Sequence, residues 1–187
     1  MRQNRKIVLG VTGSIAAYKA AELVRLFVRG GDDVTVVMTP AATEFVRPLT
    51  FQTLSRRPVF VDQFAPSAEW RPEHVALAEA ADVVVVAPAT ANTLAKMRHG
   101  IADNLLTSVL LATRAPVFAA PAMNDGMWEN AATRENVAAL AARGVRIVPP
   151  EEGELACGSG GRGRMASPQA IFEAVEEQRK IQRGEES

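Results

Sequence analysis

Apolar positions along the chain fall into two patterns, short continuous runs and runs with helical spacing. The continuous runs lie at residues 7–11, 34–38, 82–87, 116–120 and 145–148. Their length and their aliphatic composition are typical of buried strands. Between them, apolar residues recur at every third or fourth position, which predicts helices. Strands that alternate with helices predict an α/β fold, a single doubly wound, Rossmann-like (flavodoxin-like) parallel sheet sandwiched by helices.

The central strand and the main helices can be placed from these patterns. Residues 82–87 hold valine at four consecutive positions, so both faces of this strand should be buried, as in the middle of a parallel sheet. Helical spacing covers residues 15–28, 94–110, 130–143 and 168–180, and the second of these helices should break near Gly100.

Residues 47–80 follow a less regular pattern. Within them we expect a helix at 48–54, a short edge strand at 59–61 and an ordered loop at 62–72. The chain shows no internal repeat and no composition change that would mark a second domain. We therefore expect one domain over residues 1–187, which ends in a charged tail at about 181–187.

Charge balance and residue usage argue against several classes of protein. Lys plus Arg equals Asp plus Glu at 21 each, whereas a nucleic-acid-binding surface needs a basic excess. We find no apolar run that could span a bilayer and no signal peptide. The lone cysteine, Cys157, fits a reducing compartment, and it shows no metal-ligand spacing with the two histidines. We therefore expect a cytoplasmic protein that binds neither nucleic acid nor membrane and has no metal site.

The octapeptide at residues 121–128 has an unusual composition for a loop. Two Met, one Trp and one Asn follow the strand at 116–120 directly, and open α/β sheets bind ligands at the carboxyl ends of their strands. Large apolar groups around one neutral amide suit a flat ligand with a polar anchor. The same composition also fits a loop tucked beneath a helix, with Met127 and Trp128 in the core.

Hydroxyl-bearing loops follow three of the predicted strands. The first contains Gly13 and Ser14, where backbone N–H groups and a helix N-terminus favour an anion. The segment matches neither G-x-G-x-x-G nor a Walker A loop, so a single phosphate is expected rather than a dinucleotide or triphosphate. The other loops carry Thr39, Thr90 and Asn92. Each side chain fits a simple helix cap, but three such loops on one sheet edge favour a ligand site.

Two further residues are candidates for chemistry. His74 precedes the central strand and can act as a base or acid, although a structural histidine would also fit there. His99 fits the C-terminal end of a helix, and we assign it no chemistry. Cys157 lies in a glycine-rich segment, residues 153–165, that is flanked by arginines and could close like a lid. The alternative is a surface loop that carries an unused thiol.

These residues together resemble the flavin-dependent cysteine decarboxylase family. The resemblance runs in order over nearly the whole chain, and the Pro-Ala-Met-Asn and Ala-Cys-Gly motifs are its specific parts. The matching segments are residues 12–19, the segment around His74, and residues 87–93, 100–106, 121–128 and 156–165. Among the members of the family, the chain is most similar to those that act on 4′-phosphopantothenoylcysteine in coenzyme A biosynthesis.

The resemblance implies FMN as cofactor, bound at the interface of a homotrimer that often assembles into a dodecamer. It also implies a role for each matching residue. The cofactor would contact Gly13, Ser14, Thr39, Pro88, Thr90, Asn92 and Ala120. The substrate would contact Asn124, Met123, Ala156, Arg164 and Met165. His74 would be the catalytic base, Asn124 would bind the substrate carboxylate, and Cys157 would donate a proton from a flap at about 151–166.

The activity that the resemblance implies is a redox-neutral decarboxylation of this small-molecule substrate to 4′-phosphopantetheine. FMN oxidises the thiol-bearing carbon to a thioaldehyde, CO₂ leaves, and hydride returns to the enethiol while Cys157 supplies a proton. Relatives that act on peptide C-terminal cysteines generally lack that cysteine. Ser159 stands where the flap often carries an acidic residue, which leaves the peptide substrate open. A flavin-binding regulatory protein and a flavin prenyltransferase are further alternatives, and many bacterial relatives are fused to a synthetase.

Overall fold

The computed structural model describes residues 4–65, 71–154 and 160–182 of the chain. Ala156, Cys157 and Ser159, which belong to the expected flap, lie outside these ranges. The charged tail beyond residue 182 and part of the loop expected at 62–72 lie outside them as well.

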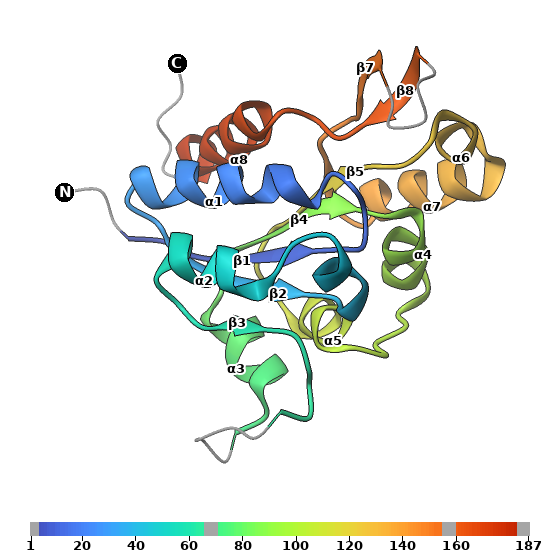
Figure 1. Ribbon diagram of the computed structural model, residues 1–187. Coiled ribbons are helices and arrows are strands. Elements are labelled where there is room, and N and C mark those ends of the chain that lie inside the picture. The colour runs from blue at the N-terminus through green and yellow to red at the C-terminus, as the bar shows by residue number, and fades with distance from the viewer. Residues whose placement is uncertain (1–3, 66–70, 155–159, 183–187) are drawn as a thin grey trace.

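A parallel sheet of six strands forms the centre of the molecule, with helices on both faces (Figure 1). The strands are β1 (Lys6–Val11), β2 (Asp33–Met38), β3 (Val59–Phe60), β4 (Val83–Ala89), β5 (Val117–Pro121) and β6 (Arg146–Ile147). Their order is β3-β2-β1-β4-β5-β6, which is the Rossmann order, and without the short β3 it matches the flavodoxin order. The predicted fold class is therefore confirmed.

The strand with four valines is central, as predicted. All seven residues of β4 are buried, and the strand pairs with β1 on one side and β5 on the other. From β1 the chain adds β2 and β3 on one side of the sheet, and it then crosses to the other side of β1 to add β4, β5 and β6. This is the switch point at which open α/β sheets form a ligand crevice.

Eight α-helices and a 3₁₀ helix are present in the described ranges. They are α1 (Ala17–Arg29), η1 (Pro40–Glu44), α2 (Pro48–Ser55), α3 (Glu73–Ala80), α4 (Ala91–His99), α5 (Leu105–Ala112), α6 (Asp125–Glu129), α7 (Ala131–Ala142) and α8 (Pro168–Gln182). None of the helices in these ranges is long and apolar enough to cross a membrane.

Alternate side chains of the strands bury against different helical layers. On β1, Leu9 and Val11 share a core with α1, α2 and α8, whereas Val8 shares a core with α3 and α5. This alternation follows from the two-residue period of a strand. At the other end of the sheet, Val86 and Ala119 pack with Leu94 of α4 and Leu140 of α7. The position of an apolar residue along its strand therefore determines which layer of helices its side chain contacts.

The break near Gly100 is confirmed and has a clear physical cause. Gly100 ends α4 in the left-handed region at φ 68°, which glycine adopts without steric cost. Asn104 then begins α5 with a capping box, in which its side chain accepts from Thr107 N–H and the Thr107 hydroxyl accepts from Asn104 N–H.

The structure differs from the sequence patterns at three local elements. Residues 73–80, to which no element was assigned, form α3, and the consecutive residues Val75, Ala76 and Leu77 hide its helical period in the sequence. The glycine-rich segment was expected to be a loop, but β7 (Glu151–Glu154) and β8 (Gly160–Arg164) form an antiparallel hairpin. The central strand, expected at 82–87, extends further and includes Pro88 and Ala89 in β4.

Candidate active site

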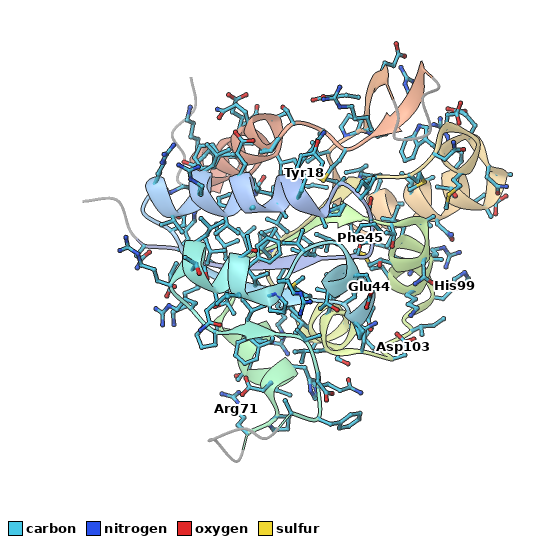
Figure 2. The ribbon with its side chains drawn as sticks, in the orientation of Figure 1. Tyr18, Glu44, Phe45, Arg71, His99 and Asp103 are labelled. Atoms are coloured by element: carbon cyan, nitrogen blue, oxygen red, sulfur yellow. The ribbon has the colours of Figure 1, made fainter. Side chains whose placement is uncertain are left out.

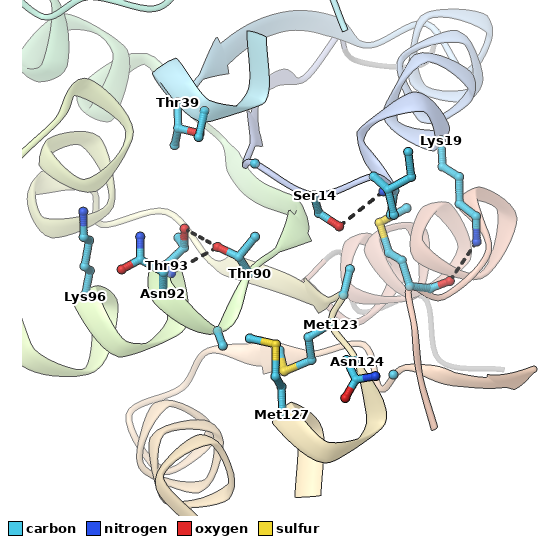
Figure 3. A pocket seen from close by; sticks show the side chains of 18 of the residues that line it. Ser14, Lys19, Thr39, Thr90, Asn92, Thr93, Lys96, Met123, Asn124 and Met127 are labelled. Carbon is cyan, nitrogen blue, oxygen red and sulfur yellow. Dashed lines mark hydrogen bonds between the residues drawn. The ribbon is translucent and has the colours of Figure 1, made fainter. Parts of the chain in front are cut away.

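A cavity of about 1080 Å³ opens at the carboxyl edge of the sheet (Figure 3). Its walls come from the β1–α1 turn, η1, the start of α4, the loop before α5, the β5–α6 segment and β8. The loops predicted to meet at one edge therefore do meet there. The volume lies slightly above the usual range of about 300–1,000 Å³ for ligand pockets, so the cavity has room for a large cofactor.

The β1–α1 turn forms one wall and is held close to η1. A Cβ atom on Gly13 would lie 2.6 Å from Cβ of Ala41, so a larger residue would push the two segments apart. Ser14 lines the cavity, and its hydroxyl accepts a hydrogen bond of 3.2 Å from the Ala16 N–H. No side chain caps α1, and Ala16 and Tyr18 at its start line the cavity, so the positive end of the helix dipole lies at this wall.

Thr39 lines the cavity and has a buried hydroxyl without a hydrogen-bond partner among the described residues. It occupies the predicted N-cap position of η1, but its side chain makes no capping bond. Leaving a buried hydroxyl unsatisfied costs about 1–3 kcal/mol. A ligand oxygen in the cavity would remove that cost, so Thr39 fits an oxygen-rich ligand such as a phosphate.

The start of α4 forms the opposite wall. Thr90 caps this helix, because its hydroxyl accepts from the Thr93 N–H at 3.3 Å and lies 3.0 Å from the Thr93 hydroxyl. Asn92 lines the cavity and is exposed. At the end of this wall, Lys96 donates to Asp103 at 2.6 Å, and this hydrogen bond lowers the pKa of the Asp103 carboxyl.

The octapeptide after β5 contributes both to the core and to the cavity. Trp128 is buried, as expected for a core residue, whereas Met123, Asn124 and Met127 line the cavity. Asn124 is the N-cap of α6, and its side-chain oxygen accepts from the Gly126 N–H at 2.9 Å. The short helix α6 thus fixes the amide at the cavity wall, where it can contact a ligand.

Two cations line the cavity beside the β7–β8 hairpin. Lys19 is half-buried on α1, and its Nζ donates to the Met165 carbonyl at 3.2 Å (Figure 3). Burial lowers the pKa of Lys19, and the nearby charge of Arg164 lowers it further. Glu151 raises it to a smaller extent. This end of the cavity therefore carries a net positive charge, which favours an anionic group.

The hairpin is attached to the cavity wall by its second strand. The Met123 N–H donates to the Gly163 carbonyl at 3.0 Å. A Cβ atom on Gly163 would lie 2.3 Å from the Met123 carbonyl oxygen, and one on Gly161 would lie 2.9 Å from Cβ of Asp125. Glycine is therefore required at position 163 for the hairpin to reach the wall this closely.

The structure brings most of the predicted site residues together. Those that line the cavity are Gly13, Ser14, Thr39, Thr90, Asn92, Met123, Asn124, Arg164 and Met165. Pro88 and Ala120 are buried in the adjoining strand ends and do not line it. His74 is half-buried on α3, which packs against α5, and it lies outside this cavity. Ala156 and Cys157 lie outside the described residues, so their roles stay predictions.

Sequence reasoning missed several residues that line the cavity, among them Tyr18, Lys19, Lys96 and Asp103. Tyr18 and Lys19 lie in the matching segment at residues 12–19, but neither was assigned a role. The sequence did contain a signal for Lys19, because the helix predicted from residue 15 follows the first strand directly and its first turn must lie at the sheet edge. No comparable signal marks Lys96, whose place depends on the packing of α4.

The chain belongs to the Flavoprotein family, which matches residues 1–180. It is 46% identical over 176 residues to the probable phosphopantothenoylcysteine decarboxylase of Streptococcus mutans, and the match covers 93% of this chain and 98% of that protein. It is 49% identical over 173 residues to the coenzyme A biosynthesis bifunctional protein CoaBC of Vibrio parahaemolyticus, a match that covers 92% of this chain and 43% of that protein. The chain thus spans less than half the length of its bifunctional relatives.

Solved structures support the same relationship. A cysteine-to-serine mutant of a PPC decarboxylase, complexed with pantothenoylaminoethenethiol, has a TM-score of 0.87 at 32% identity, with 95% of this chain and all of that chain covered. The FMN binding protein AtHal3 has a TM-score of 0.82 at 33% identity, with 94% and 97% covered. The resemblance drawn from the sequence motifs is therefore confirmed.

Proposed function

We propose that this chain binds FMN and catalyses the decarboxylation of 4′-phosphopantothenoylcysteine to 4′-phosphopantetheine. The observation that carries the proposal is the single cavity in which Thr39, Asn124 and Lys19 meet, each with the chemistry that one part of the reaction needs. The names of the relatives in coenzyme A biosynthesis support the same activity.

The residues of the cavity fit the cofactor. The unpartnered Thr39 hydroxyl, Ser14 and the uncapped start of α1 would bind the FMN phosphate. Thr90 and Asn92 would contact the rest of the cofactor along the opposite wall. Bound FMN would supply oxidation of the thiol-bearing carbon and, after CO₂ is lost, the return of hydride.

The protein's own groups would orient the substrate and move protons. The Asn124 amide would bind the substrate carboxylate and hold it at the cavity wall beside Met123. His74 would accept a proton, and Cys157 would donate one to the enethiol while the hairpin covers the site. Because the hairpin is bonded to Met123 through Gly163, a shift of the hairpin would also move the wall that carries Asn124.

The two cations beside the hairpin favour a phosphorylated substrate over a peptide. Lys19 and Arg164 line the end of the cavity at which the flap begins, and the Lys19 ammonium is engaged with a neutral carbonyl oxygen. A substrate phosphate dianion would pair with both charges. A neutral peptide would leave these cations without such a partner, so the structure supports the phosphorylated substrate.

A homotrimer, four copies of which would form a dodecamer, would explain the position of His74. We propose that His74 of one chain completes the cavity of a neighbouring chain, because it lies outside the cavity of its own chain. Mixing a His74→Asn variant with an Asn124→Leu variant would then restore activity in mixed oligomers. Two inactive variants that stay inactive when refolded together would contradict this arrangement.

A cytoplasmic location and a synthetase partner also stay predictions.

Three substrates tested in parallel decide the substrate class. The FMN-loaded protein is incubated with 4′-phosphopantothenoylcysteine, with its unphosphorylated form and with a peptide that ends in cysteine. We expect turnover of the first substrate at the highest kcat/KM, and Lys19→Met should reduce its advantage over the second. Preferential turnover of the peptide would contradict the proposal.

A further inference from the structure

Two methionine side chains form the cavity wall on the α6 side, and one of them is widely exposed. Met127 lies on α6, lines the cavity and is 49% exposed. Met123 lines the same wall and is half-buried. Figure 3 shows both side chains on this wall of the cavity. A thioether in this position can meet any small oxidant that forms inside the cavity.

The other described methionines are shielded from the cavity to different degrees. Met38 is fully buried, and Met165 lines the cavity but is only 1% exposed. Met97 is half-buried and lines a separate small cavity. Methionine oxidation follows the exposure of the sulfur. The chain therefore contains internal controls that differ from Met127 in exposure or in position.

We propose that Met127 is a site of sulfoxidation by hydrogen peroxide formed in the cavity, an inference that rests on the proposed function. When the enethiol leaves before hydride is returned, FMN stays reduced. Dioxygen then takes two electrons and two protons from reduced FMN and becomes hydrogen peroxide. The Met127 sulfur takes one oxygen atom from the peroxide, and the other oxygen leaves as water. Complete turnover consumes the hydride and produces no peroxide.

The modification has a direct consequence for the site. A sulfoxide places a polar acceptor oxygen on an otherwise apolar wall, close in sequence to Asn124, the proposed carboxylate contact. The negative end of the S–O dipole would oppose a substrate carboxylate. Oxidised protein should therefore show a higher KM for the substrate while FMN stays bound.

The test needs no substrate. FMN-loaded protein is photoreduced without oxygen, exposed to air and carried through several such cycles, and its peptides are mapped by tandem mass spectrometry. We expect the mass of one added oxygen at Met127, with Met38 and Met97 unmodified, and we expect catalase in the solution to leave this result unchanged. FMN-free protein given an equal amount of free peroxide should show less oxidation at Met127.

A second measurement follows the peroxide itself. In Met127→Leu protein the thioether that consumes peroxide is missing, so a peroxidase assay should detect more peroxide released per reoxidised FMN than from the unchanged chain. Reoxidation of bound FMN with Met127 unmodified would overturn this inference and leave the proposed function standing. A protein that takes up no FMN would overturn both.

Discussion

A single hydroxyl shows how this site is prepared for its cofactor. Thr39 occupies the position of a helix cap, yet its oxygen makes no capping bond and is buried against the cavity. The neighbouring Thr43 hydroxyl, in the same short helix, donates to the Pro40 carbonyl at 2.7 Å. The Thr43 hydroxyl is thus satisfied within the protein, whereas the Thr39 hydroxyl is available to a ligand.

Thr39→Val should weaken FMN binding without destabilising the FMN-free protein. The substitution removes a hydrogen bond to a charged group, which contributes about 1.5–3 kcal/mol, or roughly ten- to a hundredfold in Kd. It also removes an unsatisfied buried hydroxyl, so the free energy of unfolding without FMN should stay level or rise. Flavin fluorescence titration and urea denaturation measure the two effects. Thr43→Val is the control, and equal losses of FMN affinity in both variants would refute the role of Thr39.

Lys19 should give substrate binding a pH dependence. Burial and the charge of Arg164 lower its pKa, so it loses its proton at a lower pH than an ordinary lysine. Above this pKa the cation is gone, and KM for the phosphorylated substrate should rise as the pH increases. Lys19→Arg keeps the charge at all working pH values and should flatten this rise. Steady-state kinetics on the alkaline side provide the measurement, and identical profiles for both proteins would contradict the proposal.

At the scale of elements, the β7–β8 hairpin depends on glycine where it meets the β5–α6 segment. Gly163 lies at φ 155°, and a Cβ atom there would overlap the Met123 carbonyl oxygen. Gly153 on the partner strand would meet only the flexible end of the Arg164 side chain. The two glycines of one hairpin therefore differ in what a methyl group would displace.

Gly163→Ala should displace the hairpin and impair substrate binding while FMN binding is kept. The backbone contact with Met123 cannot move cheaply, and alanine at positive φ adds strain. We expect KM for the substrate to rise well above that of Gly153→Ala, with little change in FMN fluorescence. If Gly153→Ala raised KM as much as Gly163→Ala, the close contact at position 163 would not be the cause.

The elements differ in how far the sequence predicts them. The valine run of β4 and the break at Gly100 follow from local patterns, and both are confirmed. The hairpin was missed because its glycines favour a loop locally, and its pairing depends on contact with α6. Lys19 was missed as a site residue for a similar reason, because its environment is created by Met165 and Arg164, far along the chain.

At the scale of the whole molecule, one buried ionic cluster ties three distant segments together. Arg5, just before β1, pairs with Asp32 at 2.7 Å and with Glu176 of α8. Although burial lowers the pKa of Arg5, its bond to Asp32 and the charges of Asp32 and Glu176 raise it on balance. The cluster stays charged and links α8, which lies alongside α1 (Figure 2), to the start of β1 at the amino ends of the strands.

Asp32→Ala should destabilise the fold far more than Asp33→Ala. Removing Asp32 leaves the buried Arg5 without its main partner, and breaking a buried pair costs about 3–5 kcal/mol. The adjacent Asp33 pairs with Arg57, whose side chain is 53% exposed, and such pairs contribute about 0–1 kcal/mol. Denaturant unfolding of both variants gives the comparison, and equal losses would show that the cluster is not the stabilising element.

The mass of the product made from 4′-phosphopantothenoylcysteine tests the central claim most directly. The FMN-loaded protein is given this substrate under anaerobic conditions, and the product is resolved by mass spectrometry. We expect a product lighter by CO₂ alone, because the hydride taken from the substrate would be returned within the same cavity. A product lighter by CO₂ and two hydrogens, or no product from protein that carries FMN, would contradict it.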